Sequence, residues 1–274
     1  MARRLREILA YRELLRNLVV RDLKVRYRNS FFGFLWALGN PLLMMGVFTI
    51  VFTVLWPQDV HKFPVFILVG LLPWNFFAQS VMGSISSITG NGHLIKKVYF
   101  PREILPASLV ASNLVNLCLA LVALFIVIVL FGIKLTIWIV LLPLVIAVQA
   151  MFTLGVAFVL SAINVFYRDT EVIMDVVMLA LFFLTPVFYP IERLPQSFVA
   201  FGIDLPVQRL MYILNPMASL IASYRSILYG SYDGGPPGPP AADFFIRTAA
   251  TAFVFLVTGY LFFAHHSPRF GEEL

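Results

Sequence analysis

The chain is short of charged residues and has almost no cysteine. Asp, Glu, Lys and Arg make up 12% of its 274 residues, about half the share in soluble globular domains, while 60% are hydrophobic. This balance excludes water as the main solvent and indicates a membrane protein. The one cysteine, Cys118, lies in an apolar run, so it forms no intrachain disulfide and is best interpreted as a small buried hydrophobe.

The sequence also lacks the motifs of a nucleotide site and of an enzyme. No G-x-x-x-x-G-K-[ST] is present and no Gly precedes a Lys, so there is no backbone cradle for ATP phosphates. The 14 acids are scattered, and of the histidines only His265 and His266 are adjacent, which argues against a metal site. We expect no catalytic residue, metal or cofactor here; if ATP drives this protein, a separate subunit must bind ATP and Mg.

Long apolar runs are abundant instead. A spanning helix needs about 20 largely apolar residues. Six segments meet this length, which predicts an all-α membrane protein with six transmembrane helices. The predicted spans are Phe31–Leu55, Phe63–Ile85, Ile104–Phe131, Thr136–Asn164, Glu171–Tyr189 and Phe244–Ala264. Prolines interrupt four of them, where we expect kinks rather than helix ends: Pro41, Pro73, Pro143 and Pro186.

The basic residues are unevenly distributed between the two sides of these spans. Nine of the 20 Lys and Arg residues precede Phe31, and 14 lie on the same side as the N-terminus if six spans are crossed. The positive-inside rule therefore predicts a multi-pass protein of the inner (cytoplasmic) membrane with both termini in the cytoplasm. A basic cluster can also bind nucleic acid, but its position beside a span favours anionic lipid.

Short amphipathic segments accompany the spans. Apolar residues recur at helical spacing over Leu5–Val20, which predicts a helix lying on the membrane surface. Between the last two spans, Val207–Leu214 and Met217–Tyr229 are apolar but too short to cross, which predicts short re-entrant helices. Asn215 and Pro216 supply an N-cap and a first-turn proline for the second of them.

The loop between the second and third spans carries a further short helix. Leu94, Ile95 and Val98 share one helical face, Lys96 and Lys97 lie beside it, and a proline separates it from the next span. Such a helix can dock in a groove of a soluble partner, or it can be an interfacial turn held by lipid. The residues alone leave both interpretations open.

Several motifs follow one another in a specific order over nearly the whole chain. They are Arg21-Asp-Leu-Lys-Val-Arg-Tyr-Arg28, Gly33-x-x-Trp36, Asn40-Pro41, Leu94-Ile-Lys-Lys-Val-Tyr-Phe-Pro-Arg-Glu-Ile-Leu-Pro106, Asn164-x-x-Tyr167-Arg168-Asp169, Leu194-Pro195, Asn215-Pro216 and Tyr224-Arg225. In this order they resemble the ATP-binding-cassette type-2 export permeases. The branch that they are most similar to exports O-antigen, capsular polysaccharide or teichoic acid on a lipid carrier.

The resemblance implies a homodimer of permeases, two nucleotide-binding ATPase subunits and a lipid-linked polysaccharide as cargo. It divides the chain into a cytoplasmic gate helix and basic linker (1–30), a six-helix membrane domain (31–264) with a coupling helix at about 91–101 and outer gate helices at about 207–229, and a cytoplasmic tail (265–274). The residues it assigns to ATPase coupling are Leu94, Ile95, Lys96, Lys97, Val98, Tyr99, Arg168 and Asp169. Those it assigns to the outer gate are Asn215, Pro216, Tyr224 and Arg225.

Aromatic residues gather in the first and fifth spans, which face the channel in this family. Most aromatics of a membrane protein are core or interfacial residues. We expect this subset to offer flat faces to sugar rings and to seal the empty pore. The predicted channel aromatics are Phe34, Trp36, Phe48, Phe52, Phe182, Phe183, Phe188 and Tyr189.

Alternative functions differ from this one in the residues that they require or in the cargo that they move. A type-2 permease for teichoic acid, a small lipid or a drug would share the fold. A membrane glycosyl- or phosphotransferase would need an acidic metal-binding cluster at the interface. An ion-coupled flippase would need charges deeper than Asp175, which lies near the cytoplasmic end of its span. There Asp175 is either a structural residue within reach of headgroup water or one with a helix-contact or gating role.

Overall fold

The computed structural model describes residues 10–27, 36–57, 59–195, 197–200 and 203–274, and most of these are helical. In chain order the elements are α2 (Arg12–Tyr27), α3 (Trp36–Ile50), the π-helix η2 (Val51–Leu55), α4 (Phe63–Ile85), the 3-10 helix η3 (Thr89–Asn91), α5 (Gly92–Lys97), α6 (Ile104–Leu130), the 3-10 helix η4 (Ile137–Leu141), α7 (Leu142–Phe166), α8 (Thr170–Leu184), the 3-10 helix η5 (Ile191–Arg193), β1 (Phe198–Ala200), β2 (Ile203–Leu205), α9 (Val207–Leu214), α10 (Pro216–Leu228), α11 (Ala242–His266), the 3-10 helix η6 (Ser267–Arg269) and α12 (Phe270–Glu273). The helical membrane fold predicted from the sequence is confirmed in this coarse form.

Within the described ranges, four helices are long and apolar enough to cross a membrane: α4, α6, η4 joined to α7, and the helix that begins with α11. They coincide with four of the predicted spans, and α4 has the predicted bounds. The first predicted span is represented by a shorter apolar helix, Gly39–Leu55. The fifth is represented by α8, which has 15 residues and ends at Leu184 rather than at Tyr189.

Two of the four predicted proline kinks are wrong. Pro41 and Pro73 do lie inside α3 and α4. Pro143 instead stands in the first turn of α7, where a missing N–H costs nothing, and Pro186 follows the end of α8. The residue before it, Thr185, is extended (ψ 133°), as the ring of a following proline demands.

The long helices contact one another through small residues and buried amides. A Cβ atom on Gly259 of α11 would lie 2.3 Å from the carbonyl oxygen of Gly155 in α7, so these two backbones touch. The side chain of Gln149 donates to the carbonyl of Pro73 at 2.7 Å, and that of Asn164 donates to the carbonyl of Ile85 at 3.0 Å. Both bonds join α7 to α4, the central helix of the main hydrophobic core.

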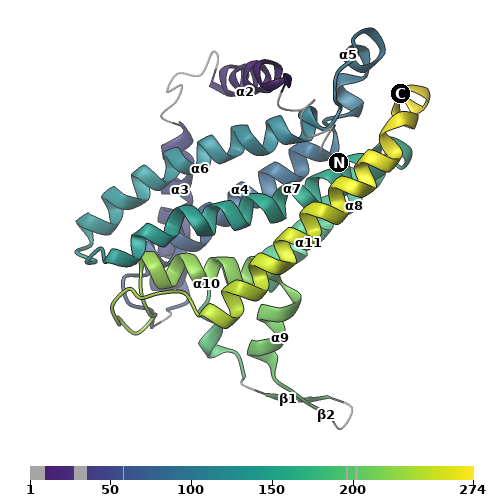
Figure 1. The fold of residues 1–274 in the computed structure, drawn as a ribbon. Helices are drawn as coiled ribbons and strands as arrows, with labels where there is room; N and C mark the ends of the chain where they lie inside the picture. Colours follow the sequence, from purple (N-terminus) through teal and green to yellow (C-terminus); the bar gives the residue numbers. More distant parts are fainter. Residues whose placement is uncertain (1–9, 28–35, 58, 196, 201–202) are drawn as a thin grey trace.

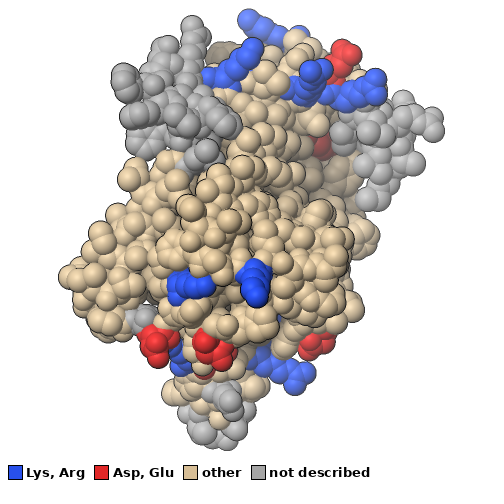
Figure 2. All heavy atoms as spheres, turned by 90° about the vertical axis from the view of Figure 1, so that its left-hand side faces the viewer, with Lys and Arg blue, Asp and Glu red and all other residues tan. Residues whose placement is uncertain are grey.

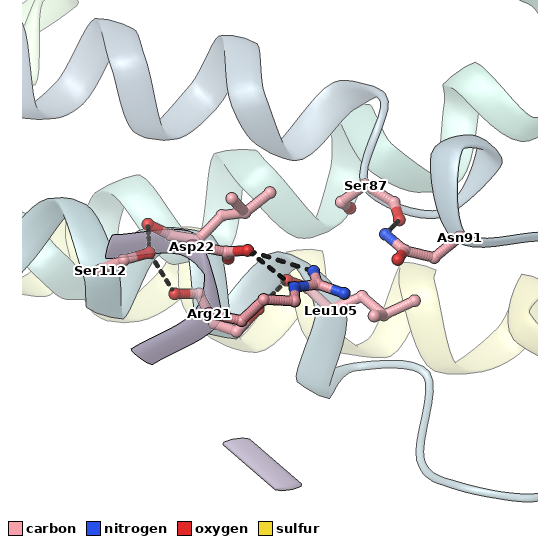
Figure 3. A network of polar contacts seen from close by, with 8 residues as sticks. Arg21, Asp22, Ser87, Asn91, Leu105 and Ser112 are labelled. Atoms are coloured by element: carbon pink, nitrogen blue, oxygen red, sulfur yellow. Dashed lines mark hydrogen bonds and ion pairs between the residues drawn. The ribbon is translucent and has the colours of Figure 1, made fainter. Parts of the chain in front are cut away.

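Helix α2 lies across α6 at one end of the bundle (Figure 1). The surface helix was predicted over Leu5–Val20; its described part begins at α2 and runs on to Tyr27, while residues 1–9 lie outside the described ranges. Leu18 faces the interior at 5% exposure. Figure 3 shows the ion pair of Arg21 and Asp22 (3.1 Å) beside the α6 turns that carry Leu105 and Ser112.

A short hairpin and two helices connect α8 to α11. Strands β1 and β2 pair antiparallel, with Phe198 opposite Leu205, and were not predicted from the sequence. The two short helices were predicted: α9 has the expected bounds and α10 begins at Pro216. The side chain of Asn215 caps α10 by accepting from the backbone N–H groups of Met217 (3.0 Å) and Ala218 (3.3 Å), which confirms the predicted N-cap.

The two ends of the bundle carry the charge. We call the end with α2, α5 and the C-terminus the α5 end, and the opposite end, with α9 and the hairpin, the α9 end (Figure 1). On the face drawn in Figure 2, Lys and Arg predominate at the α5 end, both signs occur toward the α9 end, and the broad band between them is almost free of charge. Such a band is what the hydrocarbon core of a bilayer requires.

Candidate functional site

The loop after α4 turns sharply at the α5 end. Ile95 is buried (9% exposed) and Leu94 is half-buried, as the predicted apolar face requires. Val98 does not share that face, because α5 ends at Lys97 and Val98 is extended and 54% exposed. Lys96, Lys97 and Tyr99 also point outward, and Tyr99 is 87% exposed. An apolar anchor thus carries an exposed tip of two cations, a valine and a tyrosine.

The C-terminal segment holds this turn in place. Arg102 donates to the carbonyl of Ser267, and its guanidinium carbon lies 5.9 Å from the ring centre of Phe270. Phe270 is fully buried, and Leu274 packs against α5 at Gly92. Burial lowers the pKa of Arg102, and the neighbouring Glu103 and Tyr99 partly oppose this. The sequence prediction named residues 265–274 a cytoplasmic tail and did not predict this packing, although the apolar Phe270 was a signal for it.

The turn between α7 and α8 lies at the same end (Figure 1). Arg168 and Asp169 are exposed in it, next to Tyr167, which is 72% exposed. Thr170 is buried, and its hydroxyl donates to the carbonyl of Tyr167 at 2.6 Å. The residues predicted for ATPase coupling therefore lie at one end of the bundle, and six of the eight are exposed.

The predicted channel aromatics of α3, η2 and α8 contact one another. Phe52 stacks on Phe188 with ring centres 5.6 Å apart and an interplanar angle of 16°. Phe48 meets Phe182 at 6.3 Å, and Phe188 meets Tyr189 at 5.1 Å. The cluster thus joins the first predicted span to the fifth within one chain.

The aromatic cluster also packs against residues of the core, so most of its rings are not exposed as the wall of an open channel. Phe52 contacts Phe63 at 5.6 Å and Phe182 contacts Trp74 at 5.6 Å, both on α4. Phe183 is the exception, with 56% of its side chain exposed. Phe34 lies outside the described residues. Trp36 begins α3, but its side chain also lies outside what the structure describes.

The predicted outer-gate residues surround a buried arginine. Arg225 of α10 is 8% exposed and donates to the carbonyls of Pro186 and Val187, each at 2.6 Å. Its guanidinium carbon lies 3.7 Å from the ring centre of Phe66 in α4. Because the chain after α8 is not helical, these carbonyls have no helical N–H partners, and the guanidinium donates to them instead. The face of the Phe66 ring favours the positive charge of the guanidinium.

Two further bonds fix α10 beside this arginine. The hydroxyl of Tyr224, which is fully buried, donates to the side-chain oxygen of Gln149 at 2.7 Å. The amide of Asn215 donates to the hydroxyl of Thr185 at 2.8 Å. Pro216 opens the helix. The four predicted gate residues therefore tie α10 to α7 and to the end of α8; Gln149 and Phe66 belong to the same arrangement and were not predicted for it.

A cavity of about 270 Å³ adjoins Arg225 at the α9 end. Tyr212, Tyr229 and Glu192 line it together with Pro236 and Pro239 of the linker before α11. Near its rim, hydrogen bonds from Ser231 and from the backbone of Gly235 lower the pKa of Asp233. In the part of the chain that the structure describes, no group of three or more His, Cys, Asp or Glu side chains is placed to hold a metal ion.

Long apolar helices joined by short amphipathic elements define a multi-pass membrane protein. The chain matches the family model described as ABC-2 type transporter over residues 13–229. It is 39% identical, over the full length of both chains, to the O-antigen export system permease protein RfbA of Myxococcus xanthus. The chain therefore belongs to the ABC-2 type transporter family, as the motif order indicated.

More distant relatives have related names. An O-antigen export system permease protein RfbA of Klebsiella pneumoniae is 28% identical over 93% of this chain and 92% of its own length. The polysialic acid transport protein KpsM of Escherichia coli is 22% identical over 78% of this chain and 81% of its own. These relatives are named as permeases or transport proteins, which agrees with a transport subunit rather than an enzyme.

Loss of the arginine at the centre of the outer-gate residues should unfold the α9 end. We expect Arg225→Met to lower the free energy of unfolding by roughly 1–3 kcal/mol for each carbonyl left unpaired. The free energy of unfolding of Arg225→Lys should lie between those of wild type and Arg225→Met. An ammonium group cannot donate to the two carbonyls with the geometry of the planar guanidinium. Thermal unfolding of the purified chain in detergent measures both.

Arg209→Met is the matched control, since Arg209 is exposed on the neighbouring α9 and its loss should stay within about 0.5 kcal/mol. Equal melting temperatures for Arg225→Met and Arg209→Met would show that the buried bonds do not stabilise the fold.

Proposed function

We propose that this chain is the transmembrane subunit of an ATP-driven exporter that moves a lipid-linked polysaccharide, of the O-antigen kind, across the cytoplasmic membrane. The observation that carries the proposal is the 39% identity, without truncation of either chain, to an O-antigen export permease. The polysialic acid transport protein among the more distant relatives supports a glycan cargo. ATP hydrolysis belongs to a separate subunit, since the sequence contains no phosphate-binding loop.

Six spans with both termini in the cytoplasm fit the fold. Four helices have the length and composition of spans, and α3 with η2 and α8 add two shorter ones. The π-helix η2 and the segment after Leu184 extend these two toward the α9 end. The α5 end carries the basic residues of α2 and α5, so the positive-inside rule places it in the cytoplasm. Helices α9 and α10 then lie at the outer surface as re-entrant elements.

A homodimer would cover the faces that this chain leaves bare. Helix α8 buries only Thr170 and Met178 among its described side chains. The exposed apolar residues of α8 continue those of α3 and η2; together they are Leu43, Met44, Val47, Ile50, Val54, Leu55, Val172, Ile173, Val176, Val177, Leu179, Phe183 and Leu184. Lipid can cover such faces, but the aromatic cluster lies between the same two elements. A second copy packed against this face would enclose a path between the two chains, and the aromatic clusters of both chains would line it.

The exposed tip of the α5 turn is the proposed grip for the ATPase. Ile95 anchors the turn in a cluster that includes Phe158 and Phe263, so a pull on the tip reaches α7 and α11. Lys96, Tyr99 and the Arg168–Asp169 turn would contact the partner. When ATP closes the partner dimer, the turn moves and α3 separates from α8. The aromatic cluster then opens into a channel for sugar rings.

Export is tested directly in cells. Deleting the gene for this chain should remove the glycan from the cell surface and cause lipid-linked glycan to accumulate inside. Re-expression of the wild-type chain together with its ATPase should restore both, as measured by surface glycan staining and by extraction of the lipid-linked fraction. A deletion strain with normal surface glycan and no internal accumulation would contradict the proposed cargo.

Changes at the exposed tip should uncouple the ATPase without unfolding the chain. We expect Lys96→Glu, Lys97→Glu and Tyr99→Ala together to reduce co-purification of the ATPase at least tenfold, and the fold should tolerate these changes because the three side chains are exposed. Mass measurement of the wild-type complex should give two permeases and two ATPases.

Trp56→Ala is the control, because Trp56 is 73% exposed at the opposite end of the first span. Undiminished co-purification in the triple variant would refute the coupling role, and a single permease in the complex would refute the dimer.

Shortening the aromatic side chains should make the resting membrane leaky. Phe52→Ala with Phe188→Ala removes a stacked pair between η2 and the end of α8, and we expect ion flux through vesicles containing the purified complex without ATP. Phe166→Ala is the matched control, since Phe166 packs on Phe270 at the α5 end. Vesicles as tight as wild type would show that this cluster does not close the path.

A further inference from the structure

A second cavity lies on the other side of the bundle from the outer-gate residues. It has a volume of about 290 Å³ and is formed where α2, α3, α4 and α6 meet. Its polar lining consists of one guanidinium and five carboxamides: Arg26, Asn40, Asn75, Gln79, Asn113 and Asn116. Neither the aromatic cluster nor the α5 turn contributes to it, so the proposed transport path leaves it unexplained.

The concentration of amides is the unusual feature of this cavity. Polar side chains inside apolar helices normally bond to a neighbouring helix, as Gln149 and Asn164 do with carbonyls of α4. The side-chain oxygens of Asn113 and Asn164 are both buried without a hydrogen-bond partner among the described residues, but of the two only Asn113, which is 3% exposed, lines the cavity. A buried polar atom left unpaired costs about 1–3 kcal/mol, which a ligand in the cavity would recover.

The charge of the lining indicates what kind of ligand fits. No carboxylate occurs among the described lining residues, while Arg26 donates to the side-chain oxygen of Gln79 at 3.4 Å from the rim. A guanidinium binds phosphate oxygens, and carboxamides both donate to and accept from hydroxyl groups. Apolar side chains, among them Phe76 and Leu117, complete the wall and suit carbon-bound hydrogens.

The position of the cavity indicates where the ligand comes from. Arg26 is exposed on the α2 helix at the basic end of the bundle, so the cavity reaches the surface there. Basic pockets between membrane helices on the cytoplasmic side are typical binding sites for anionic lipid head groups. The cavity volume is close to the lower bound for small-molecule sites, about 300 Å³, and suits one head group.

We propose that this cavity binds a phosphate ester that carries free hydroxyl groups, with Arg26 on the phosphate and Asn113 on a hydroxyl. A phosphate ester with free hydroxyl groups is found in the head group of an anionic phospholipid such as phosphatidylglycerol and in a soluble polyol phosphate. The site goes beyond the export function and does not rest on a polysaccharide cargo, because it is inferred from the cavity, its lining and its place at the basic end of the bundle.

Binding to the purified full-length chain in detergent tests the site. Native mass spectrometry would measure retention of phosphatidylglycerol, of phosphatidylcholine with the same acyl chains, and of soluble glycerol phosphate. We expect the first to bind at least tenfold more tightly than the second, whose head group lacks hydroxyls and net charge. Whichever of phosphatidylglycerol and glycerol phosphate binds more tightly identifies the source.

Variants assign the binding to the cavity. Arg26→Gln and Asn113→Leu should each weaken binding about tenfold, as expected for loss of a hydrogen bond to a charged group or of a buried polar partner. Arg21→Gln is the matched control on the same helix, since Arg21 pairs with Asp22, and it should change binding less than twofold. Gln79→Leu, at an exposed position, supplies a second cavity variant should Asn113→Leu fail to fold.

Equal retention in the cavity variants and in Arg21→Gln would overturn the proposal, as would equal retention of phosphatidylglycerol and phosphatidylcholine together with no retention of glycerol phosphate. The readout is independent of export. A chain that binds the head group but exports no polysaccharide would refute the proposed cargo alone, and the reverse result would refute the site alone.

Discussion

Polar groups that enter a hydrocarbon layer must find partners inside the protein, and this requirement shapes the structure from end to end. Where α8 stops short of a full span, the freed carbonyls of Pro186 and Val187 accept from Arg225. Where α10 begins, Asn215 caps it. Charged residues lie mainly at the two ends on the face of Figure 2. The short helix α10 at the α9 end is therefore joined to the end of α8 by a small number of specific bonds.

The strength of these bonds differs between the two ends. At the α9 end a guanidinium, a tyrosine hydroxyl and an asparagine amide hold α10 to α7 and α8. At the α5 end the turn is held mainly by apolar packing of Ile95 and Phe270. Apolar packing has no fixed direction, so this end can shift under a pull while the hydrogen-bonded end keeps its register. In the proposed mechanism the ATPase acts at the α5 end, which is the end that can shift.

The sequence predicted most of the helices because their signals are local. The apolar run of α4 and the Asn215–Pro216 start of α10 depend only on neighbouring residues. Prediction failed where distant contacts decide. Val98 was assigned to a helical face that ends one residue earlier, and Pro143 was taken for a kink although α7 begins one residue before it. The packing of Phe270 beneath Arg102 was not predicted. For the candidate site, the sequence named Tyr224 and Arg225 by motif but not Gln149 and Phe66, which lie far from them along the chain.

The amide-lined cavity shows how the same constraint can indicate a ligand. Gln149, Asn164 and Asn113 are all buried amides in apolar helices, and the first two are bonded to backbone carbonyls of another helix. Had Asn113 served only packing, an apolar residue of its size would avoid the cost of an unpaired oxygen. Asn113 instead lines a space shared with four other amides and an arginine. An apolar membrane protein has few such polar positions, so their gathering around one cavity is better explained by a polar occupant than by helix association.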